Sequence, residues 1–495
     1  MDTKKLFGQL SKESVIYGVA SVSTKMISFV LFPLFARKFN PDDYGAINIL
    51  NTLGFFTVAL CSLGLDSATA RWFYDSEDKQ FRKKIFSNWL IAQASLIIGA
   101  ILIILFCGEL FFVRLYLNTE HGYSLLMIVC GNMLLGLLPS ILSLYFILNR
   151  FAVKAMTFSI ASAVVSMGSC FLLVFKFNMG LVGFYLGQTI AFLFSTIIAY
   201  IFFLRKYIHF KLFDWPLLKK MVAYGITVVP AQLSNYFLLF ASGLIVHSLT
   251  SQTDLGYYQV AATIATCIAL ITGPFGQAFQ PISFSIMTNQ NAPRFYSLVL
   301  DMYVGIMAFF CLALSFFYPE LIKWLLTEKY SPSAFVSGII TFSSFIYSIN
   351  IIAVIGMAKE KKIYYYGIVV TVANLFMIFL VYILTRFFHI TGTAIAFLVG
   401  QSLTVIVLFY YSQKIFSIPY RFFKNGLIIS IALSFFLFVG KIKELVNFNF
   451  FFIKTFMIVV FLGIILLLNK NLIEAARKML QTFLKSKPKI NEELT

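Results

Sequence analysis

Residues 85–106 read IFSNWLIAQASLIIGAILIILF, a run without a charged side chain. The run follows Arg82, Lys83 and Lys84, and it is long enough to cross the roughly 30 Å hydrocarbon core of a bilayer as one helix. Its apolar residues are continuous rather than alternating, which favours a helix over a strand of a membrane β-barrel. The run therefore predicts a transmembrane helix.

Similar runs fill the chain of 495 residues, of which 60% are hydrophobic and 12% are charged. Soluble domains carry about 25% charged residues, so the composition excludes a soluble enzyme, a disordered scaffold and a secreted disulfide domain. The fold class is predicted to be an all-α polytopic membrane protein with about fourteen transmembrane helices. The predicted spans are 14–36, 45–65, 85–106, 123–146, 155–175, 181–204, 221–247, 257–280, 297–318, 333–356, 364–385, 391–411, 425–440 and 449–468.

The Lys and Arg residues predict how these spans face the membrane. With the N-terminus, every second loop and the C-terminus on one side, 28 of the 39 Lys and Arg residues lie there and 9 lie opposite, while Lys25 and Lys454 fall inside spans. Cytoplasmic loops of membrane proteins carry such an excess. Both termini are therefore predicted to be cytoplasmic, and the net charge of +19 reflects topology rather than a nucleic-acid partner.

The two halves of the chain resemble each other at a nearly constant offset. Asp43-Tyr44-Gly45 follows the first span, and Asp254-Leu255-Gly256 follows the seventh span 211 residues later. Further pairs at offsets of 207 to 211 are Tyr17-Gly18 with Tyr224-Gly225, Glu109-Leu110 with Glu320-Leu321, Gly183 with Gly392, and Arg150 with Lys359. With six spans in each half, the halves are expected to be parallel repeats.

The repeat predicts a domain organisation. We expect a six-helix lobe at 1–204, a cytoplasmic linker at 205–220, a second six-helix lobe at 221–411 and two extra helices at 412–468. The segment 469–495 is predicted to be a cytoplasmic tail, with an amphipathic helix at 470–485 on the membrane surface. Two-lobed bundles of this kind enclose a cleft and alternate between two access states, which is typical of a transporter.

Lys25 is the charge nearest the middle of a predicted span, where burial costs about 2.5–3.5 kcal/mol. It shares a helical face with Ser21 and Ser28, and an offset of 207 places Gln232 and Asn235 at corresponding positions of the seventh span. The two polar stripes are expected to face each other across a cationic cavity that accepts an anionic group such as a phosphate. A lysine held by helix-packing hydrogen bonds is the alternative.

Four other positions inside the spans are singled out. Asp301, beside Arg294, is interpreted as a charge at a helix start, with a partner in the cavity as the alternative. Lys454 is expected to extend to the headgroups near the outer end of the last span. Pro33 and Pro230 lie in the two stripe-bearing helices and are candidate hinges, or static kinks.

Signals of catalysis or metal binding are missing from the sequence. It contains no GxxxxGK[ST] motif for nucleotide phosphates. The six cysteines form no CxxC pair, and the four histidines are solitary. We therefore predict a protein that is not an enzyme, without a cofactor or a metal.

Several short motifs together resemble a known family. They are Phe39-Asn40-Pro41-Asp42-Asp43-Tyr44-Gly45, Gly64-Leu65-Asp66-Ser67-Ala68-Thr69-Ala70-Arg71, Asp254-Leu255-Gly256-Tyr257-Tyr258, Trp324-Leu325-Leu326 and Tyr330-Ser331-Pro332. On these motifs the chain is similar to Wzx-type flippases of O-antigen or capsule repeat units, in the multidrug/oligosaccharidyl-lipid/polysaccharide exporter superfamily. The resemblance covers nearly the whole chain and implies a MATE-like fold.

The resemblance also implies an activity and partners. A polyprenyl-diphosphate-linked oligosaccharide would pass from the inner to the outer leaflet of the bacterial cytoplasmic membrane, for the synthesis of surface polysaccharide such as lipopolysaccharide or capsule. Membrane lipids, and the polymerase and chain-length machinery of the same pathway, would be its partners. Arg71 would lie near the cytoplasmic mouth, with Asp66 as its charge partner. Many such proteins carry an Asp-Arg pair where this chain has Ser242-Gly243.

Other functions stay open at this point. A MATE-like drug or cation antiporter shares the superfamily fold, although it usually needs buried acids where this chain has a lysine. A lipid II-type flippase is closer in chemistry. A membrane-embedded polymerase or ligase would need a large outer loop with catalytic charges, and the longest predicted outer loops are short. A purely structural scaffold would not explain a lysine in the middle of a membrane span.

Overall fold

The computed structural model describes residues 23, 24, 26, 27, 29–73, 78–107, 122–149, 151–286, 292–360, 362, 364–442 and 450–469. Within these ranges the chain is helical, and no strand occurs among the described residues. Twelve helical stretches in this part of the chain are long and apolar enough to cross a membrane. The predicted all-α polytopic fold is therefore confirmed.

The helices of the first half follow the predicted spans closely. They are α2 (Pro41–Ser62), α3 (Leu65–Phe73), α4 (Lys79–Cys107), α6 (Gly122–Leu135), α7 (Leu137–Leu148), α8 (Ala152–Phe171), α9 (Gly180–Ala199) and α10 (Arg205–Tyr207). Two π-helical segments, η2 (Leu172–Lys176) and η3 (Tyr200–Leu204), prolong α8 and α9. About half of the first predicted span, 14–36, lies outside the described residues, and 29–38 are helical.

The second half begins with a long helix. Its helices are α11 (Trp215–Leu249), α12 (Gln252–Ala265), α13 (Ala269–Ser285), α14 (Ala292–Leu325), α15 (Ser333–Ser348), α16 (Asn350–Ala353), α17 (Ile355–Lys359), α18 (Tyr364–Ile415), α19 (Phe422–Ile442) and α20 (Phe450–Leu468). Three short 3-10 segments are η4 (Phe210–Leu212), η5 (Thr266–Ile268) and η6 (Glu328–Tyr330). The predicted amphipathic helix at 470–485 lies outside the described residues.

Two tight reversals occupy equivalent positions in the two halves. Asn178, between η2 and α9, and His389, within α18, are 211 residues apart and have φ values of 52° and 51°, a left-handed region that non-glycine residues rarely adopt. Around His389 the hydroxyls of Thr385 and Thr393 are 2.7 Å apart, whereas eight residues of straight helix span roughly 12 Å. Helix α18 is therefore a hairpin of the two spans predicted at 364–385 and 391–411.

Local sequence explains where α2 and α12 begin. Pro41 occupies the first turn of α2, and the backbone N–H of Asn40 donates to Asp43 Oδ2 at 2.8 Å. At the corresponding start of α12, the hydroxyl of Ser251 accepts from the backbone N–H of Asp254 at 3.0 Å. These caps start α2 four residues earlier than the span predicted at 45–65.

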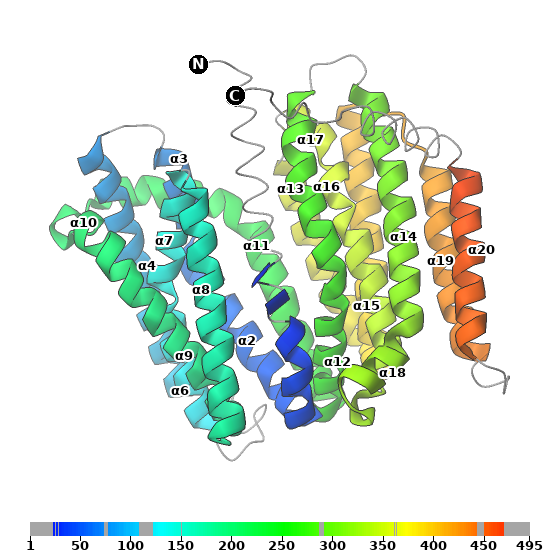
Figure 1. Ribbon diagram of the computed structural model, residues 1–495. Helices are drawn as coiled ribbons and strands as arrows, with labels where there is room; N and C mark the ends of the chain where they lie inside the picture. The colour runs from blue at the N-terminus through cyan, green and yellow to red at the C-terminus, as the bar shows by residue number, and fades with distance from the viewer. Residues whose placement is uncertain are drawn as a thin grey trace, which may run out of the picture.

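The helices form two groups (Figure 1). Helices α3 to α10 lie on one side, α12 to α20 lie on the other, and α11 runs obliquely between them. The buried apolar residues of α2 belong mostly to the core of the first group, so we count α2 with it. Helix α11 contacts α2, α3 and α4 of the first group as well as α12 and α18 of the second. It begins at Trp215, inside the segment 205–220 predicted as a linker, because the Asp214 carboxylate accepts from the backbone N–H of Leu217 and caps the helix.

Buried apolar side chains form one large cluster in each group of helices. The first cluster also takes in Tyr318, Ile322 and Tyr330 from the second half of the chain. Large apolar side chains such as Ile103 and Phe106 on α4 are exposed, as expected for a surface that faces lipid rather than water. We call the two groups the N lobe and the C lobe.

Candidate functional site

The lobes meet where α2 and α12 begin. We call this the outer end, since the distribution of Lys and Arg predicts that it faces the outside. Thr253 Oγ1 donates to Asp42 Oδ1, and Asn48 Nδ2 donates to Gln259 Oε1 at 2.5 Å. Each pair joins residues 211 apart, which is the offset of the internal repeat. Two equivalent residues can touch only close to the axis that relates the repeats, so this axis passes between the two residues of each pair. The predicted repeat is thus built into the contact between the lobes.

Glycines make this close approach of α2 and α12 feasible. A Cβ atom on Gly45 would lie 2.4 Å from the carbonyl oxygen of Gln252, and one on Gly256 would lie 1.7 Å from that of Pro41. These two contacts are again related by the repeat offset. Gly243 faces Asn48 in the same way, with a would-be Cβ 2.6 Å from Asn48 Oδ1. The absence of a side chain at Gly243 therefore leaves room for the side-chain amide of Asn48.

Side chains from both halves complete the outer contact. The Arg37 guanidinium donates to the carbonyls of Trp324 and Leu325, each at 3.2 Å. Tyr330 Oη donates to the carbonyl of Phe39 at 2.6 Å, and Lys329 Nζ donates to the same oxygen. Burial lowers the pKa of Lys329, and the carboxylate of Asp43 opposes this shift. We refer to these bonds, with Asp42–Thr253 and Asn48–Gln259, as the outer seal.

A cavity of about 520 Å³ lies between the lobes, next to the outer seal. Its lining includes Phe32, Tyr44 and Asn51 on one side, and Gln259 and Thr263 of α12 on the other. Thr24 and Phe29 also line it, and Lys25 stands between them in the sequence. We call it the central cavity.

A second cavity, of about 710 Å³, lies within the N lobe and extends to α11. On α2 its lining runs from Leu50 to Ser62, which is the half of the helix farther from the outer seal. Asn51 lines this cavity and the central cavity, so the two adjoin. The side-chain amides of the lining are those of Asn51, Gln93, Asn132, Gln188 and Gln232. We call this the N-lobe cavity.

Three of these amides are held by neighbouring side chains. Tyr185 Oη donates to Asn51 Oδ1 at 3.3 Å, and the indole N–H of Trp89 donates to Gln93 Oε1 at 2.7 Å. Thr189 Oγ1 donates to Asn132 Oδ1 at 2.8 Å. The bonds fix the rotamers of these three amides, so they are preorganised polar groups on a wall that is otherwise mostly apolar.

A third cavity, of about 810 Å³, occupies the C lobe between α11, α12, α13, α15 and α18. Its lining corresponds to that of the N-lobe cavity. Asn132, Ser140 and Ile147 line the N-lobe cavity, and Ser343, Ile351 and Ala358, each 211 residues later, line the third. We call it the C-lobe cavity.

The predicted stripe residues have different outcomes. Ser21, Lys25 and Ser28 lie outside the described residues, so the cationic character of the cavity stays a prediction. Gln232 lines the N-lobe cavity. Asn235 lies on α11 and accepts a hydrogen bond from Asn374 Nδ2 of α18 at 2.8 Å, which ties the two helices together.

The predicted pairing of Arg71 with Asp66 is wrong. Among the described residues no hydrogen bond or ion pair joins them, and Asp66 Oδ1 is buried without a partner at the wall of the N-lobe cavity. The Arg71 guanidinium instead lies over the rings of Tyr224 and Trp72, 5.2 and 5.7 Å from their centroids. Cation–π attraction to these rings holds it near the start of α11.

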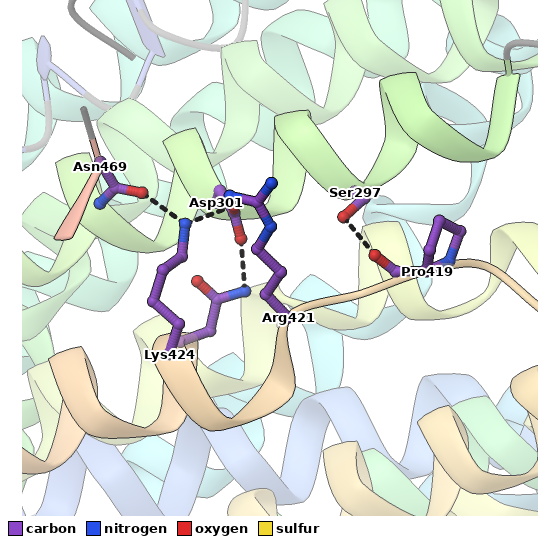
Figure 2. Close-up of polar contacts among 7 residues, drawn as sticks. Ser297, Asp301, Pro419, Arg421, Lys424 and Asn469 are labelled. Atoms are coloured by element: carbon purple, nitrogen blue, oxygen red, sulfur yellow. Dashed lines mark hydrogen bonds and ion pairs between the residues drawn. The ribbon is translucent and has the colours of Figure 1, made fainter. Parts of the chain in front are cut away.

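Asp301 is buried, and it bonds to the extra helices of the C lobe rather than to a neighbour on its own helix (Figure 2). Its carboxylate accepts from Lys424 Nζ and from Asn425 Nδ2, the latter at 2.9 Å, and Arg421 lies 3.7 Å away. Lys424 also donates to Asn469 Oδ1 at 2.6 Å. The expected charge at a helix start is therefore a buried cluster that joins α14 to α19 and to the end of α20.

Lys454 does not extend to the headgroups, contrary to expectation. It is 1% exposed, and its Nζ donates to Glu320 Oε1 of α14 at 2.6 Å. This pair fastens α20 to α14 near the outer end. Pro33 and Pro230 lie within helical segments, and α11 continues as a helix through Pro230. Their role as hinges stays a prediction.

The amides Asn51, Gln93 and Asn132 were missed by a search of the spans for charged residues. Their signal was present in the sequence, because each lies inside an otherwise apolar run. Among the described residues, no group of three or more His, Cys, Asp or Glu side chains could hold a metal ion.

Solved structures of other proteins share this arrangement of helices. The fold is similar to the lipid II flippase MurJ in an inward closed conformation, with a TM-score of 0.71, 17% identity and coverage of 93% of this chain and 100% of that one. An inward-facing MATE multidrug transporter of the MOP superfamily gives a TM-score of 0.65 at 13% identity, over 79% of this chain and 94% of that one. The protein therefore shares the fold of these transporters and flippases.

The family follows from the sequence. Residues 10–287 match the model of a family described as "Polysaccharide biosynthesis protein". The match spans more than half of the chain, so this protein belongs to the polysaccharide biosynthesis protein family. Protein 1 of the Lsg locus of Haemophilus influenzae is 35% identical over 63 residues, which are 13% of this chain and 16% of that relative.

Proposed function

We propose that this protein translocates polyprenyl-diphosphate-linked oligosaccharide repeat units from the inner to the outer leaflet of the bacterial cytoplasmic membrane, for surface polysaccharide synthesis. The observation that carries the proposal is the N-lobe cavity of a polysaccharide biosynthesis family member, with its five side-chain amides. Amides donate and accept hydrogen bonds at once, as the hydroxyls of a sugar do. A wall of such groups suits an uncharged glycan.

The diphosphate needs a different partner from the sugars. No Lys or Arg occurs among the described lining residues of the three cavities. Lys25, which follows the cavity-lining Thr24 in the sequence, is our candidate for the diphosphate. The polyprenyl tail would stay in the bilayer, where its apolar surface is already out of water.

Translocation by alternating access would require the outer seal to open. The seal consists of individual hydrogen bonds on and around the repeat axis, so a modest rotation of the lobes would break several of them together. Lipid II-type transport shares this geometry and remains the alternative closest in chemistry. Drug or cation antiport is less well supported, because Asp66 is the one acid among the described lining residues of the three cavities.

The test begins with deletion of the gene in its host. Lipid-linked glycans are then separated by membrane leaflet, and their masses are measured by mass spectrometry. Surface polysaccharide is quantified in parallel. We expect complete repeat units to accumulate on the cytoplasmic face and surface polysaccharide to be lost. Normal surface glycan with unchanged pools of lipid-linked glycan would contradict the proposal. Drug efflux would then be the function to test.

Complementation with Lys25 variants tests the diphosphate site. Lys25→Ala should reduce export at normal protein abundance, because the anionic group loses its counter-charge, while Lys25→Arg should retain part of it. Lys79→Ala, which removes an exposed lysine at the start of α4, is the matched control and should export normally. Wild-type export by Lys25→Ala at normal abundance would overturn the assignment.

A further inference from the structure

The C-lobe cavity has an entirely uncharged lining among the described residues. Its volume of about 810 Å³ lies within the roughly 300–1,000 Å³ typical of small-molecule sites. Hydroxyls and amides are spread over its wall, as on Thr272, Ser343, Ser344, Tyr347, Asn350 and Gln401. Such a wall can form many neutral hydrogen bonds but offers no counter-charge to an ion.

Two amides on this wall have unused hydrogen-bonding atoms. Asn350 is 5% exposed, and neither its Oδ1 nor its Nδ2 has a partner. Gln401 is 8% exposed, and its Oε1 has no partner. Buried polar atoms are nearly always paired, so two amides with free atoms at one cavity indicate that something else satisfies them.

The backbone presents Asn350 at a break in a helix. Between α15 and α16 the N–H of Ile349 donates to the carbonyl of Ile346, three residues back instead of four, at 3.1 Å. Ile352 donates to Ile349 in the same tightened pattern at 2.9 Å. Such tightened turns inside a helix often mark functional positions.

The equivalent positions of the N lobe are apolar. Pro139 precedes Asn350 by 211 residues. Phe192 precedes Gln401 by 209 residues, which is the offset of Gly183 and Gly392 on the same helices, and Phe192 lines the N-lobe cavity. The positions equivalent to Asn350 and Gln401 therefore carry no amide in the N lobe, so these two amides are not required by the shared fold.

We propose that the C-lobe cavity is a second glycan-binding subsite, in which Asn350 and Gln401 hydrogen-bond the hydroxyls of an uncharged sugar. The proposal rests on the proposed function for the identity of the glycan. Each sugar hydroxyl can donate to Gln401 Oε1 or Asn350 Oδ1 and accept from Asn350 Nδ2. Phe397 and Tyr258, with ring centroids 6.4 Å apart, supply apolar faces for the sugar ring.

Other occupants fit this wall less well. A cationic drug would meet no carboxylate among the described lining residues, and a diphosphate would meet no lysine or arginine there. A lipid tail would leave the free amide atoms of Asn350 and Gln401 unpaired in an apolar environment, which is unfavourable. A sugar satisfies the amides and covers the aromatic rings at once.

The test replaces each amide by an apolar residue of similar size. Asn350→Leu and Gln401→Leu are introduced into the full chain and compared with Ser402→Ala, whose hydroxyl bonds to the carbonyl of Leu398 on its own helix. Export is measured in the deletion strain, and thermal midpoints are measured on purified protein. Loss of an unpaired amide should leave the thermal midpoint equal or higher. Export should fall about tenfold, as expected for one lost hydrogen bond to the substrate.

A binding measurement separates the sugar from the lipid. Purified protein in lipid nanodiscs receives lipid-linked glycan extracted from the deletion strain, or polyprenyl phosphate without sugar. The glycan should raise the thermal midpoint of the wild type and raise it less in Gln401→Leu, while polyprenyl phosphate should act equally on both.

Three results would overturn the proposal. The first is full export by both leucine variants at normal abundance, which would mean that water rather than a sugar hydrogen-bonds the amides. The second is a loss of thermal stability in both variants, which would make the amides structural. The third is a deletion strain with unchanged lipid-linked pools, which would remove the proposed function and the glycan subsite together.

Discussion

The N-lobe and C-lobe cavities share a frame but differ in polar chemistry. Their walls are built from equivalent helices, and lining residues recur 211 positions apart. In the N lobe the amides of Asn51, Gln93 and Asn132 are bonded to neighbouring side chains. In the C lobe the amides of Asn350 and Gln401 have free atoms. Corresponding residues thus line the two cavities, while the amides on their walls lie at different positions.

The largest effect on export is expected when the two lobes are prevented from moving relative to each other. Asp42→Cys with Thr253→Cys places two thiols on the repeat axis, where the native side chains are hydrogen-bonded. A short, cleavable thiol cross-linker should stop export completely, and reduction should restore it, because both cavities serve transport only if the outer seal opens. Each single variant is the control. Undiminished export by the cross-linked protein would contradict a moving seal.

The next largest effect should come from a feature of the C lobe alone, the attachment of α19 and α20. Asp301→Ala leaves Lys424, whose side chain is 15% exposed, without its carboxylate, and breaking a buried ion pair costs about 3–5 kcal/mol. We expect a large fall in the thermal midpoint and in the amount of protein in membranes.

The exposed pair Lys323–Glu328, with N and O atoms 2.7 Å apart, is the matched control. Lys323→Ala should leave the thermal midpoint unchanged, because solvent screens the interaction. An unchanged midpoint in Asp301→Ala would show that the cluster does not hold the extra helices.

The smallest effect on stability is expected from removing one amide from each cavity wall. It tests the difference between the two cavities directly. Asn132→Leu loses the bond from Thr189 and the bond that Asn132 donates to the Tyr185 carbonyl, and it should destabilise the protein by about 2 kcal/mol. Asn350→Leu removes an unpartnered amide, so its thermal midpoint should match or exceed that of the wild type. Equal losses in the two variants would mean that both amides are structural.

Much of the fold could be predicted from the sequence, because helices in a membrane are specified locally. Every predicted span from the second to the fourteenth has its counterpart among the described helices, including the hairpin at His389. The repeat offset of 211 reappears in the Asp42–Thr253 and Asn48–Gln259 bonds. An apolar run and a recurring motif need no knowledge of neighbours, since lipid and backbone hydrogen bonding impose them.

The candidate site was harder to predict. Gln232 lines the N-lobe cavity, whereas the neighbours of Lys25 line the central cavity, so the predicted pairing of the two stripes stays a prediction. Arg71 turns to aromatic rings, and Asp66 keeps a free oxygen. Charge alone did not identify their partners, because Tyr224 and Trp72 compete for the guanidinium. The bonded amides of the N lobe were overlooked because neutral side chains in a span leave no trace in a count of charges.

The sequence by itself determined a polytopic helical protein with two repeats, because hydropathy and spacing are properties of neighbouring residues. Only the tertiary structure decided that Asp301 binds Lys424, 123 residues away. It also decided that Asn51, Gln93 and Asn132 are bonded to neighbouring side chains while Asn350 and Gln401 have unpaired atoms. Such pairings depend on which helix faces come together and how closely they pack. Residues far apart in the chain meet there, and no local pattern records their distance.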